Sequence, residues 1–232
     1  MSIRENIEAL NKRVAEAAAR VGRTPDEITI VAVAKTFPVE KILEAVESGI
    51  RIIGENRVQE AKQKFVRLGN VVEWHMVGHL QTNKVKDALK IFRMIHSLDS
   101  IRLAREIDRR AEKPIDCLIE VNTSQEPSKF GIKPNELIQF YEALHPFKQL
   151  NIVGLMTIGP GWAIQDPEAS RSCFRLLREL RDELARAFDQ PFPILSMGMT
   201  SDFEVAIEEG SNLIRVGTAI FGPRDYKCLN RT

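Results

Sequence analysis

The chain has 232 residues, of which 44% are hydrophobic and 28% are charged, the composition of an ordinary globular domain. Its 33 basic and 32 acidic side chains leave a formal net charge of +1, so composition gives no electrostatic case for a nucleic-acid or anionic-membrane partner. No segment approaches the roughly 20 consecutive apolar residues that a membrane span requires.

Residues 1–22, MSIRENIEALNKRVAEAAARVG, lack the apolar core of a signal peptide. They predict an amphipathic helix, because apolar residues recur at helical spacing: Ile3, Ile7, Leu10, Val14, Ala17 and Val21. The three cysteines, Cys117, Cys173 and Cys228, are odd in number and far apart, which argues against a disulfide framework or a zinc site. We therefore expect a cytoplasmic protein.

Beyond the first helix, short apolar runs alternate with amphipathic stretches. The runs predict strands at 28–34, 51–53, 73–77, 92–96, 115–121, 151–157, 193–197 and 212–216. The stretches between them predict helices at 39–48, 56–68, 80–90, 99–112, 134–145, 167–188 and 202–209. Eight such repeats of roughly 25 residues are the pattern of an α/β fold, the parallel (β/α)8 TIM-type barrel.

One barrel domain accounts for the whole chain, 1–232, because no linker or low-complexity run divides it. The extra N-terminal helix could take the place of a short last helix. The alternative, an open doubly wound sheet, would place a glycine-rich fingerprint after the first strand. The residues that follow Ala34 are KTFPVE, without a glycine, which favours the barrel.

The helix at 167–188 has the clearest pattern. Asp166 and Pro167 are suited to the N-cap and first helical position. One apolar stripe follows, at Phe174, Leu177, Leu180, Leu184 and Phe188.

A lysine ends the first predicted strand, ITIVAVAKTFP. Lysine is rare inside a buried strand, and barrels bind ligands at the C-terminal ends of their strands. Lys35 would emerge at that edge, where polar and glycine residues such as GEN at 54–56 also gather. An amine in a largely apolar pocket has its charged form disfavoured, which makes it a nucleophile.

Two loops predict a phosphate site. In LSMGMTSDFEVAIEEG, Gly198 loosens the backbone and Thr200 or Ser201 can cap the following helix, whose free amides attract anions. In NLIRVGTAIFG, Gly217 and Thr218 follow the eighth strand. Barrels often hold a phosphate at the loops after strands 7 and 8. The alternative is a capped helix and an ordinary turn.

A lysine combined with a phosphate site is what pyridoxal 5′-phosphate (PLP), held as an imine, requires. Arg215 adds a chemical detail, because a permanently charged donor facing the pyridine nitrogen would leave that nitrogen unprotonated. The cofactor would then be a poor electron sink, which argues against transaminase chemistry. The other interpretation of Arg215, a surface ion-pairing residue, is disfavoured by its apolar strand.

The motifs VAVAKT, GENRVQEA, WHMVGHLQTNK, VNTSQEPSKFGI, GLMTI and LSMGMTSDFEVAIEEGSNLIRVGTAIFG closely resemble the pyridoxal phosphate homeostasis protein family. Its members are single-domain relatives of the N-terminal barrel of alanine racemase, PLP fold type III. The resemblance extends to about Tyr226. It implies a cytoplasmic, monomeric protein that carries PLP on Lys35 as an internal aldimine and acts in PLP homeostasis and amino-acid balance, without clear turnover. PLP-dependent apoenzymes are the partners it suggests.

By position, the resemblance implies cofactor-binding roles for Lys35, Asn56, Met197, Thr200, Ser201, Arg215, Gly217 and Thr218. Lys35 would form the imine, Asn56 would line the ring and Arg215 would face the pyridine nitrogen. The four threonine, serine and glycine residues would hold the phosphate. Met197 and Met156 would pack the pocket floor, the alternative being that they are ordinary core residues, and Ser196 could also contribute.

Two departures from alanine racemase weaken an enzymatic interpretation. That enzyme has a tyrosine four residues after its lysine, where this chain has Val39, and it takes a second base, also a tyrosine, from another domain across a dimer. Here the tyrosines are Tyr141, in a predicted helix, and Tyr226, near the end. Racemisation needs proton transfer on both faces of the carbanion, and only Lys35 is a convincing base. A racemase-like enzyme is the second hypothesis, and an imine-forming aldolase the third.

His75 and His79 form an H-x3-H pair, but Gly78 interrupts the run and prevents a shared helical face, so we predict no metal site. The polar loop 122–131 could act as a lid or as an ordinary connection.

Overall fold

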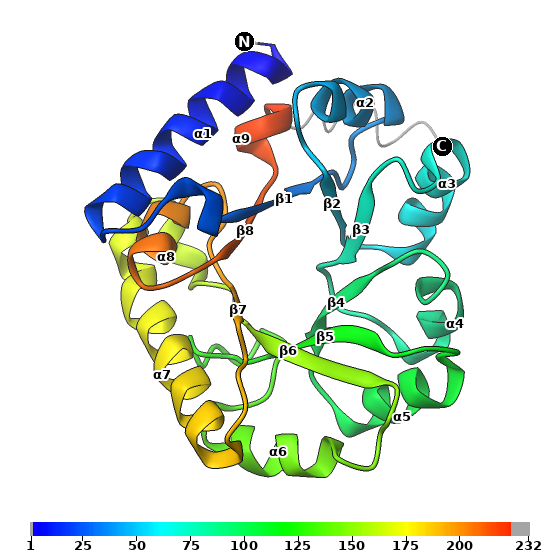
Figure 1. Cartoon of the computed structure of the whole chain (residues 1–232). Helices are drawn as coiled ribbons and strands as arrows, with labels where there is room; N and C mark the ends of the chain where they lie inside the picture. Colours follow the sequence, from blue (N-terminus) through cyan, green and yellow to red (C-terminus); the bar gives the residue numbers. More distant parts are fainter. Residues whose placement is uncertain (1, 224–232) are drawn as a thin grey trace.

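The computed structural model describes residues 2–223. Eight parallel strands close into a barrel in chain order, and the first strand is hydrogen-bonded to both the second and the eighth. Figure 1, viewed along the barrel, shows the helices surrounding the ring of strands. The (β/α)8 prediction is confirmed.

The element bounds follow the predicted ones closely. The strands are β1 (Thr29–Val33), β2 (Ile52–Glu55), β3 (Glu73–Met76), β4 (Met94–Leu98), β5 (Ile115–Glu120), β6 (Leu150–Met156), β7 (Ile194–Ser196) and β8 (Leu213–Val216). The helices are α1 (Ile3–Arg20), α2 (Val39–Glu47), α3 (Val58–Leu68), α4 (Val85–Ala88), α5 (Ile101–Arg110), α6 (Leu137–Leu144), α7 (Arg171–Phe188), α8 (Phe203–Glu208) and α9 (Thr218–Phe221).

The seven predicted helices are all shorter than expected, and α4, α6 and α7 each begin directly after a 3-10 turn. A 3-10 turn at Thr82–Lys84 precedes α4, and no side chain caps the start of that helix. A second 3-10 turn, Pro167–Ser170, precedes α7, and the Asp166 side chain makes no capping bond. The proline therefore starts the tighter turn, and the α-helix begins about one turn later than the N-cap pattern suggested, while the apolar stripe starts at Phe174 as predicted.

The N-terminal helix α1 closes the ring of helices beside the four-residue α9, as predicted (Figure 1). Ser2 and Glu5 form a capping box that starts α1. The Asn6 side-chain nitrogen donates to the carbonyl of Ile220 at 2.9 Å, which ties α1 to α9. No helix within residues 2–223 is both long enough and apolar enough to cross a membrane.

The buried apolar side chains form two layers. The larger lies between the strands and the helices. The smaller fills the barrel interior and contains Val31, Val77, Met94, Leu118, Met156 and Leu213. Buried polar side chains from several strands interrupt this inner layer, among them His75, His96, Ser196 and Arg215. Because buried polar groups are costly unless hydrogen-bonded, their positions indicate where the barrel carries chemistry.

Candidate functional site

Lys35 lies in a turn that begins two residues after β1 ends, and its side chain is half-buried. The next residue, Thr36, has a φ of 71°, which a β-branched residue rarely adopts. Two side chains of α3 hold this turn from behind: Lys64 Nζ donates to the Ala34 carbonyl at 2.8 Å, and Glu60 Oε1 accepts from the Thr36 amide at 2.5 Å. The surrounding structure thus imposes a strained backbone next to Lys35.

The two α3 side chains belong to a buried ionic cluster that the sequence analysis missed. Lys64 is 6% exposed, and its Nζ lies 2.6 Å from Glu55 Oε1 and 2.7 Å from Glu60 Oε1. Burial raises the pKa of Glu55 to about 7, although the Lys64 ammonium opposes this rise. One signal was present in the sequence: Lys64 shares the apolar face of its helix with Ala61 and Leu68 and follows Glu60 at i+4.

The loops after β7 and β8 meet, as the phosphate-site prediction requires. Thr200 Oγ1 accepts from the Ala219 amide at 3.3 Å, and the Arg215 amide donates to the Gly198 carbonyl at 3.0 Å. A Cβ on Gly217 would lie 3.1 Å from the carbonyl oxygen of Val33, at the end of β1. The second loop therefore packs beside the strand that leads to Lys35.

Gly198 has a structural reason to be glycine. Its φ is +96°, and a Cβ would lie 2.6 Å from Ala206 Cβ and 2.9 Å from Phe203 Cα. Any side chain here would be strained and would push the loop away from α8.

The predicted cap of α8 was wrong. Asp202 is the N-cap, with Oδ1 accepting from the Met199 amide at 2.7 Å and Oδ2 accepting from Ser170 Oγ at 2.7 Å. The Asp202 side chain makes no hydrogen bond to the first turn of α8, because both of its oxygens bind groups outside that helix. Thr200 and Ser201 precede this N-cap position and do not occupy it.

Arg215 is 5% exposed, so it is not a surface ion-pairing residue. Its guanidinium donates to the Thr157 carbonyl at 2.8 Å, the Ser196 carbonyl at 2.8 Å and Ser196 Oγ at 2.6 Å. Burial lowers the pKa of Arg215 to about 10, against the opposing charges of Glu120 and Asp202. Within residues 2–223, these bonds use three of its five N–H donors.

Asn56 follows β2 at the same end of the barrel. Its Oδ1 is buried and has no hydrogen-bond partner among the described residues. A hollow of about 380 Å³ lies beside it, bordered by Gly78 and His79. An unpaired buried acceptor is expensive, so Asn56 is suited to a ligand that supplies a donor.

The backbone of Gly78 supports Asn56 directly, since a Cβ on Gly78 would lie 2.5 Å from the Asn56 carbonyl oxygen and 2.7 Å from its Cα. Backbone atoms cannot rotate away, so we expect Gly78→Ala to displace Asn56 and to lower the free energy of unfolding by about 1–3 kcal/mol. Urea denaturation measures this. Gly161→Ala is the control, because the nearest atom to its Cβ would be 3.8 Å away. Equal stability of the two variants would contradict this packing.

The two methionines proposed for the pocket floor lie in different layers. Met156 belongs to the cluster inside the barrel, whereas the fully buried Met197 belongs to the cluster between strands and helices. Ser196, the neighbour of Met197, contacts Arg215. Of the two methionines, Met156 is the one that packs with the barrel interior.

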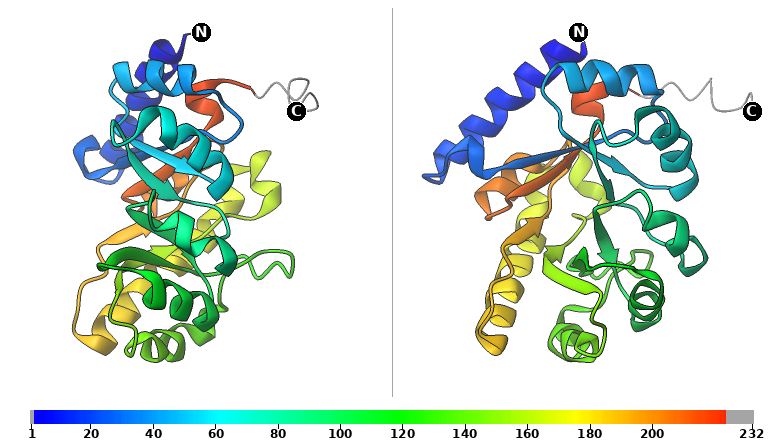
Figure 2. Two further views of the ribbon diagram at one scale, coloured as in Figure 1. Left: turned by 90° about the vertical axis from the view of Figure 1, so that its right-hand side faces the viewer. Right: turned by 45° about the vertical axis from the view of Figure 1, so that its right-hand side comes forward.

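The polar loop 122–131 follows β5 and is the green loop that projects from the barrel in the left view of Figure 2. The Phe130 ring stacks on His79, with centroids 3.9 Å apart and planes at 12°. Lys129 Nζ donates to the Gly159 carbonyl at 2.5 Å. The loop is therefore anchored at both β3 and β6.

His79 Nδ1 lies 3.1 Å from Asp99 Oδ2, while His75 lies inside the barrel and contacts His96. The two histidines of the H-x3-H pair therefore do not point to a common site. In the described part of the chain, no three histidine, cysteine, aspartate or glutamate side chains gather as a metal site. Tyr226 and Cys228 lie outside the described residues.

The barrel and this edge define a class of protein. Residues 3–225 match the family model described as "Alanine racemase, N-terminal domain", and an alanine racemase from Clostridium difficile superposes with a TM-score of 0.74 at 15% identity, over 96% of this chain and 57% of that one. The chain belongs to the alanine racemase N-terminal-domain class of barrels.

Closer relatives define the family within that class. A pyridoxal phosphate homeostasis protein of Aquifex aeolicus is 44% identical over 97% of this chain and its own full length, and one from Escherichia coli is 39% identical over 97% of both. The structure of PipY from Synechococcus elongatus with PLP bound superposes with a TM-score of 0.79 at 36% identity, over 90% of this chain and 100% of that one. This chain belongs to the pyridoxal phosphate homeostasis protein family.

Proposed function

We propose that this chain binds pyridoxal 5′-phosphate through the Lys35 amine and acts in intracellular PLP homeostasis. The observation that carries the proposal is the pairing of β1 with β8. Val31 pairs with Arg215 and Ala32 with Val216, so the strand of Lys35 runs directly beside the strand of the arginine and the glycine loop. An amine, a buried guanidinium and a glycine-containing loop therefore share one corner of the barrel.

The residues present fit the chemistry of this cofactor. Arg215 has five guanidinium N–H groups, and its hydrogen bonds to residues 2–223 use three of them, which leaves two for a ligand. The buried Asn56 Oδ1 accepts no hydrogen bond from those residues. The loops of Gly198 and Gly217 carry the Thr200 and Thr218 hydroxyls beside backbone amides, a setting suited to a phosphate. Met197 contributes packing behind the first loop, and Ser201 lies beside Thr200.

When bound, PLP would supply an aldehyde that condenses with an amine and a ring that withdraws electrons. The chain itself binds and orients. Arg215, a permanent donor at near-neutral pH, would keep the atom that it faces unprotonated, and the anchored loop 122–131 with Phe130 would restrict water at the edge.

A racemase would need a second base opposite Lys35. Tyr141, the one tyrosine in the described part of the chain, accepts from Gln190 Nε2 at 2.6 Å and packs against Phe188 and Phe192 on the outside of the barrel. It cannot serve the C-terminal edge. This favours a carrier, and we further propose one cytoplasmic, monomeric domain, 1–232, that exchanges cofactor with PLP-dependent apoenzymes.

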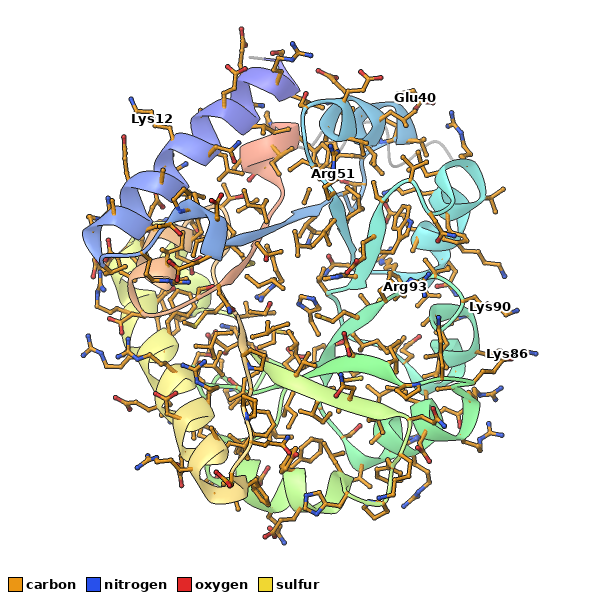
Figure 3. The ribbon with its side chains drawn as sticks, viewed as in Figure 1. Lys12, Glu40, Arg51, Lys86, Lys90 and Arg93 are labelled. Atoms are coloured by element: carbon orange, nitrogen blue, oxygen red, sulfur yellow. The ribbon has the colours of Figure 1, made fainter. Side chains whose placement is uncertain are left out.

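We expect Lys35→Ala to abolish covalent uptake of PLP. Wild-type protein should gain the absorbance band of lysine-bound cofactor, and borohydride reduction followed by mass spectrometry should place a pyridoxyl phosphate adduct on the Lys35 peptide. Lys12→Ala is the control, because Lys12 is exposed on the outer face of α1 (Figure 3). A wild type that takes up no PLP, or a Lys35→Ala variant that retains the adduct, would refute the proposal. A substrate fragment on Lys35 would indicate an aldolase.

A further inference from the structure

A continuous series of hydrogen bonds crosses the interior of the barrel from Arg215 to the opposite end. Arg215 donates to Ser196 Oγ at 2.6 Å, which lies 3.0 Å from His96 Nδ1. His96 Nε2 lies 3.0 Å from His75 Nδ1, and His75 Nε2 lies 2.7 Å from Glu73 Oε1. These side chains come from β8, β7, β4 and β3.

The two ends of this series fix the direction of every bond. A guanidinium can only donate and a carboxylate can only accept. His75 therefore carries a proton on Nε2 and donates it to Glu73. If both imidazoles are neutral, His75 Nδ1 then accepts from His96 Nε2, and His96 Nδ1 accepts the Ser196 proton while Ser196 Oγ accepts from Arg215. With both imidazoles neutral, one arrangement of protons satisfies all four contacts.

The burial of these groups disfavours any other arrangement of the protons. His96 and Ser196 are fully buried and His75 is 2% exposed, so an unpaired donor or acceptor here would pay its full desolvation cost. Burial lowers the pKa of His96 well below its usual value, and the positive charge of Arg215 acts in the same direction. His96 is therefore neutral and must choose one tautomer.

We propose that Ser196 and His96 are positioning residues for Arg215, and that His75 and Glu73 extend this control to the N-terminal end of the barrel. Ser196 Oγ and the Ser196 carbonyl both accept from one guanidinium nitrogen, which fixes the plane of the group. The effect of this orientation on PLP binding rests on the proposed function. The series of hydrogen bonds does not depend on it.

The outer end is open to solvent. The Glu73 side chain is 49% exposed and borders a groove of about 970 Å³ whose lining includes Lys86, Lys90 and Arg93. Figure 3 shows these three basic side chains near α4 and the start of β4. A change at Glu73 therefore alters the end of the series without disturbing the buried core.

Replacing the terminal carboxylate tests the inference. In a Glu73→Gln variant, the new side-chain amide could donate to His75 Nε2, which would permit the reverse arrangement: His75 protonated on Nδ1 and donating to His96 Nε2, and His96 protonated on Nδ1 and donating to Ser196 Oγ. We expect a measurable fraction of His96 to shift its proton from Nε2 to Nδ1. Glu112→Gln, in the same groove and exposed, is the matched control and should leave His96 unchanged.

Nitrogen-15 NMR of the histidine rings, in protein stripped of cofactor, reports the tautomers directly. In the wild type we expect the proton on His96 Nε2 and a scalar coupling across the N–H···N bond to His75 Nδ1. A wild-type proton on His96 Nδ1, or a Glu73→Gln spectrum identical to that of Glu112→Gln, would overturn the inference whether or not the chain binds PLP.

A second measurement tests the positioning role in loaded protein. Ser196→Ala removes one charge-assisted bond to Arg215 but leaves both carbonyl acceptors, so we expect PLP affinity to fall about tenfold. The absorbance of the bound cofactor should shift in Ser196→Ala and in Glu73→Gln but not in Glu112→Gln. Unchanged affinity and absorbance in a folded Ser196→Ala variant would overturn the positioning role, whereas a wild type without PLP uptake would refute the proposed function alone.

Discussion

Lys64→Met is expected to lower the free energy of unfolding by about 3–5 kcal/mol, because it removes the partner of a buried carboxylate. Glu55 is fully buried, and in the variant it would lose the ammonium 2.6 Å away. The Ala34 carbonyl would lose its bond from Lys64 Nζ as well. The turn that carries Lys35 should loosen, so PLP uptake should weaken together with stability. Urea denaturation at pH 8 and cofactor titration measure the two effects.

The matched control is Lys62→Met on the same helix. Lys62 is 60% exposed and pairs with Asp87 at 3.4 Å, and such surface pairs contribute about 0–1 kcal/mol. The double variant Lys64→Met/Glu55→Leu should recover part of the lost stability, since no buried charge is then left alone. A Lys64→Met variant as stable as Lys62→Met would show that the cluster does not hold the turn.

The barrel was predictable because its signal is local. Each strand is a short apolar run, each helix has an apolar stripe, and eight repeats leave few topologies. The wrong predictions concern the starts of helices, where several neighbouring residues are suited to the N-cap or first helical position. Asp202, and not Thr200 or Ser201, occupies the N-cap position of α8 without a side-chain capping bond, and the proline at 167 begins a 3-10 turn before α7.

The site was predictable in part for the same reason. Lys35 stands out in an apolar run, and the glycine loops stand out at the ends of two strands. The series from Glu73 to Arg215 depends instead on which face of each strand points inward. Strands of a parallel barrel are buried on both faces, so their sequences do not reveal which residues point into the barrel and which point toward the helices. Met156 and Met197 show the same ambiguity, since their layers differ although both follow similar apolar runs.

A buried acid at the end of β5 gives the second large expected effect. Glu120 ends β5 and is 5% exposed. Burial raises its pKa from 4.5 to about 7; the negative charge of Asp99 adds to the rise, and the positive charge of Arg215 opposes it. The folded chain therefore keeps a proton that the unfolded chain releases. The stability that this proton contributes is complete below pH 4.5 and is lost as pH rises through about 7.

Glu120→Gln should remove that dependence, because an amide does not titrate. We expect the variant to match the wild type near pH 4.5 and to exceed its free energy of unfolding by up to about 3 kcal/mol above pH 7. Urea denaturation between pH 4 and pH 9 measures the difference. Glu55 titrates in both proteins, so the comparison isolates Glu120, and Glu112→Gln, the same substitution at an exposed position, is the control. A difference that stays constant with pH would mean that Glu120 is already ionised in the folded chain. The Arg215 guanidinium would then have a full counter-charge within the barrel.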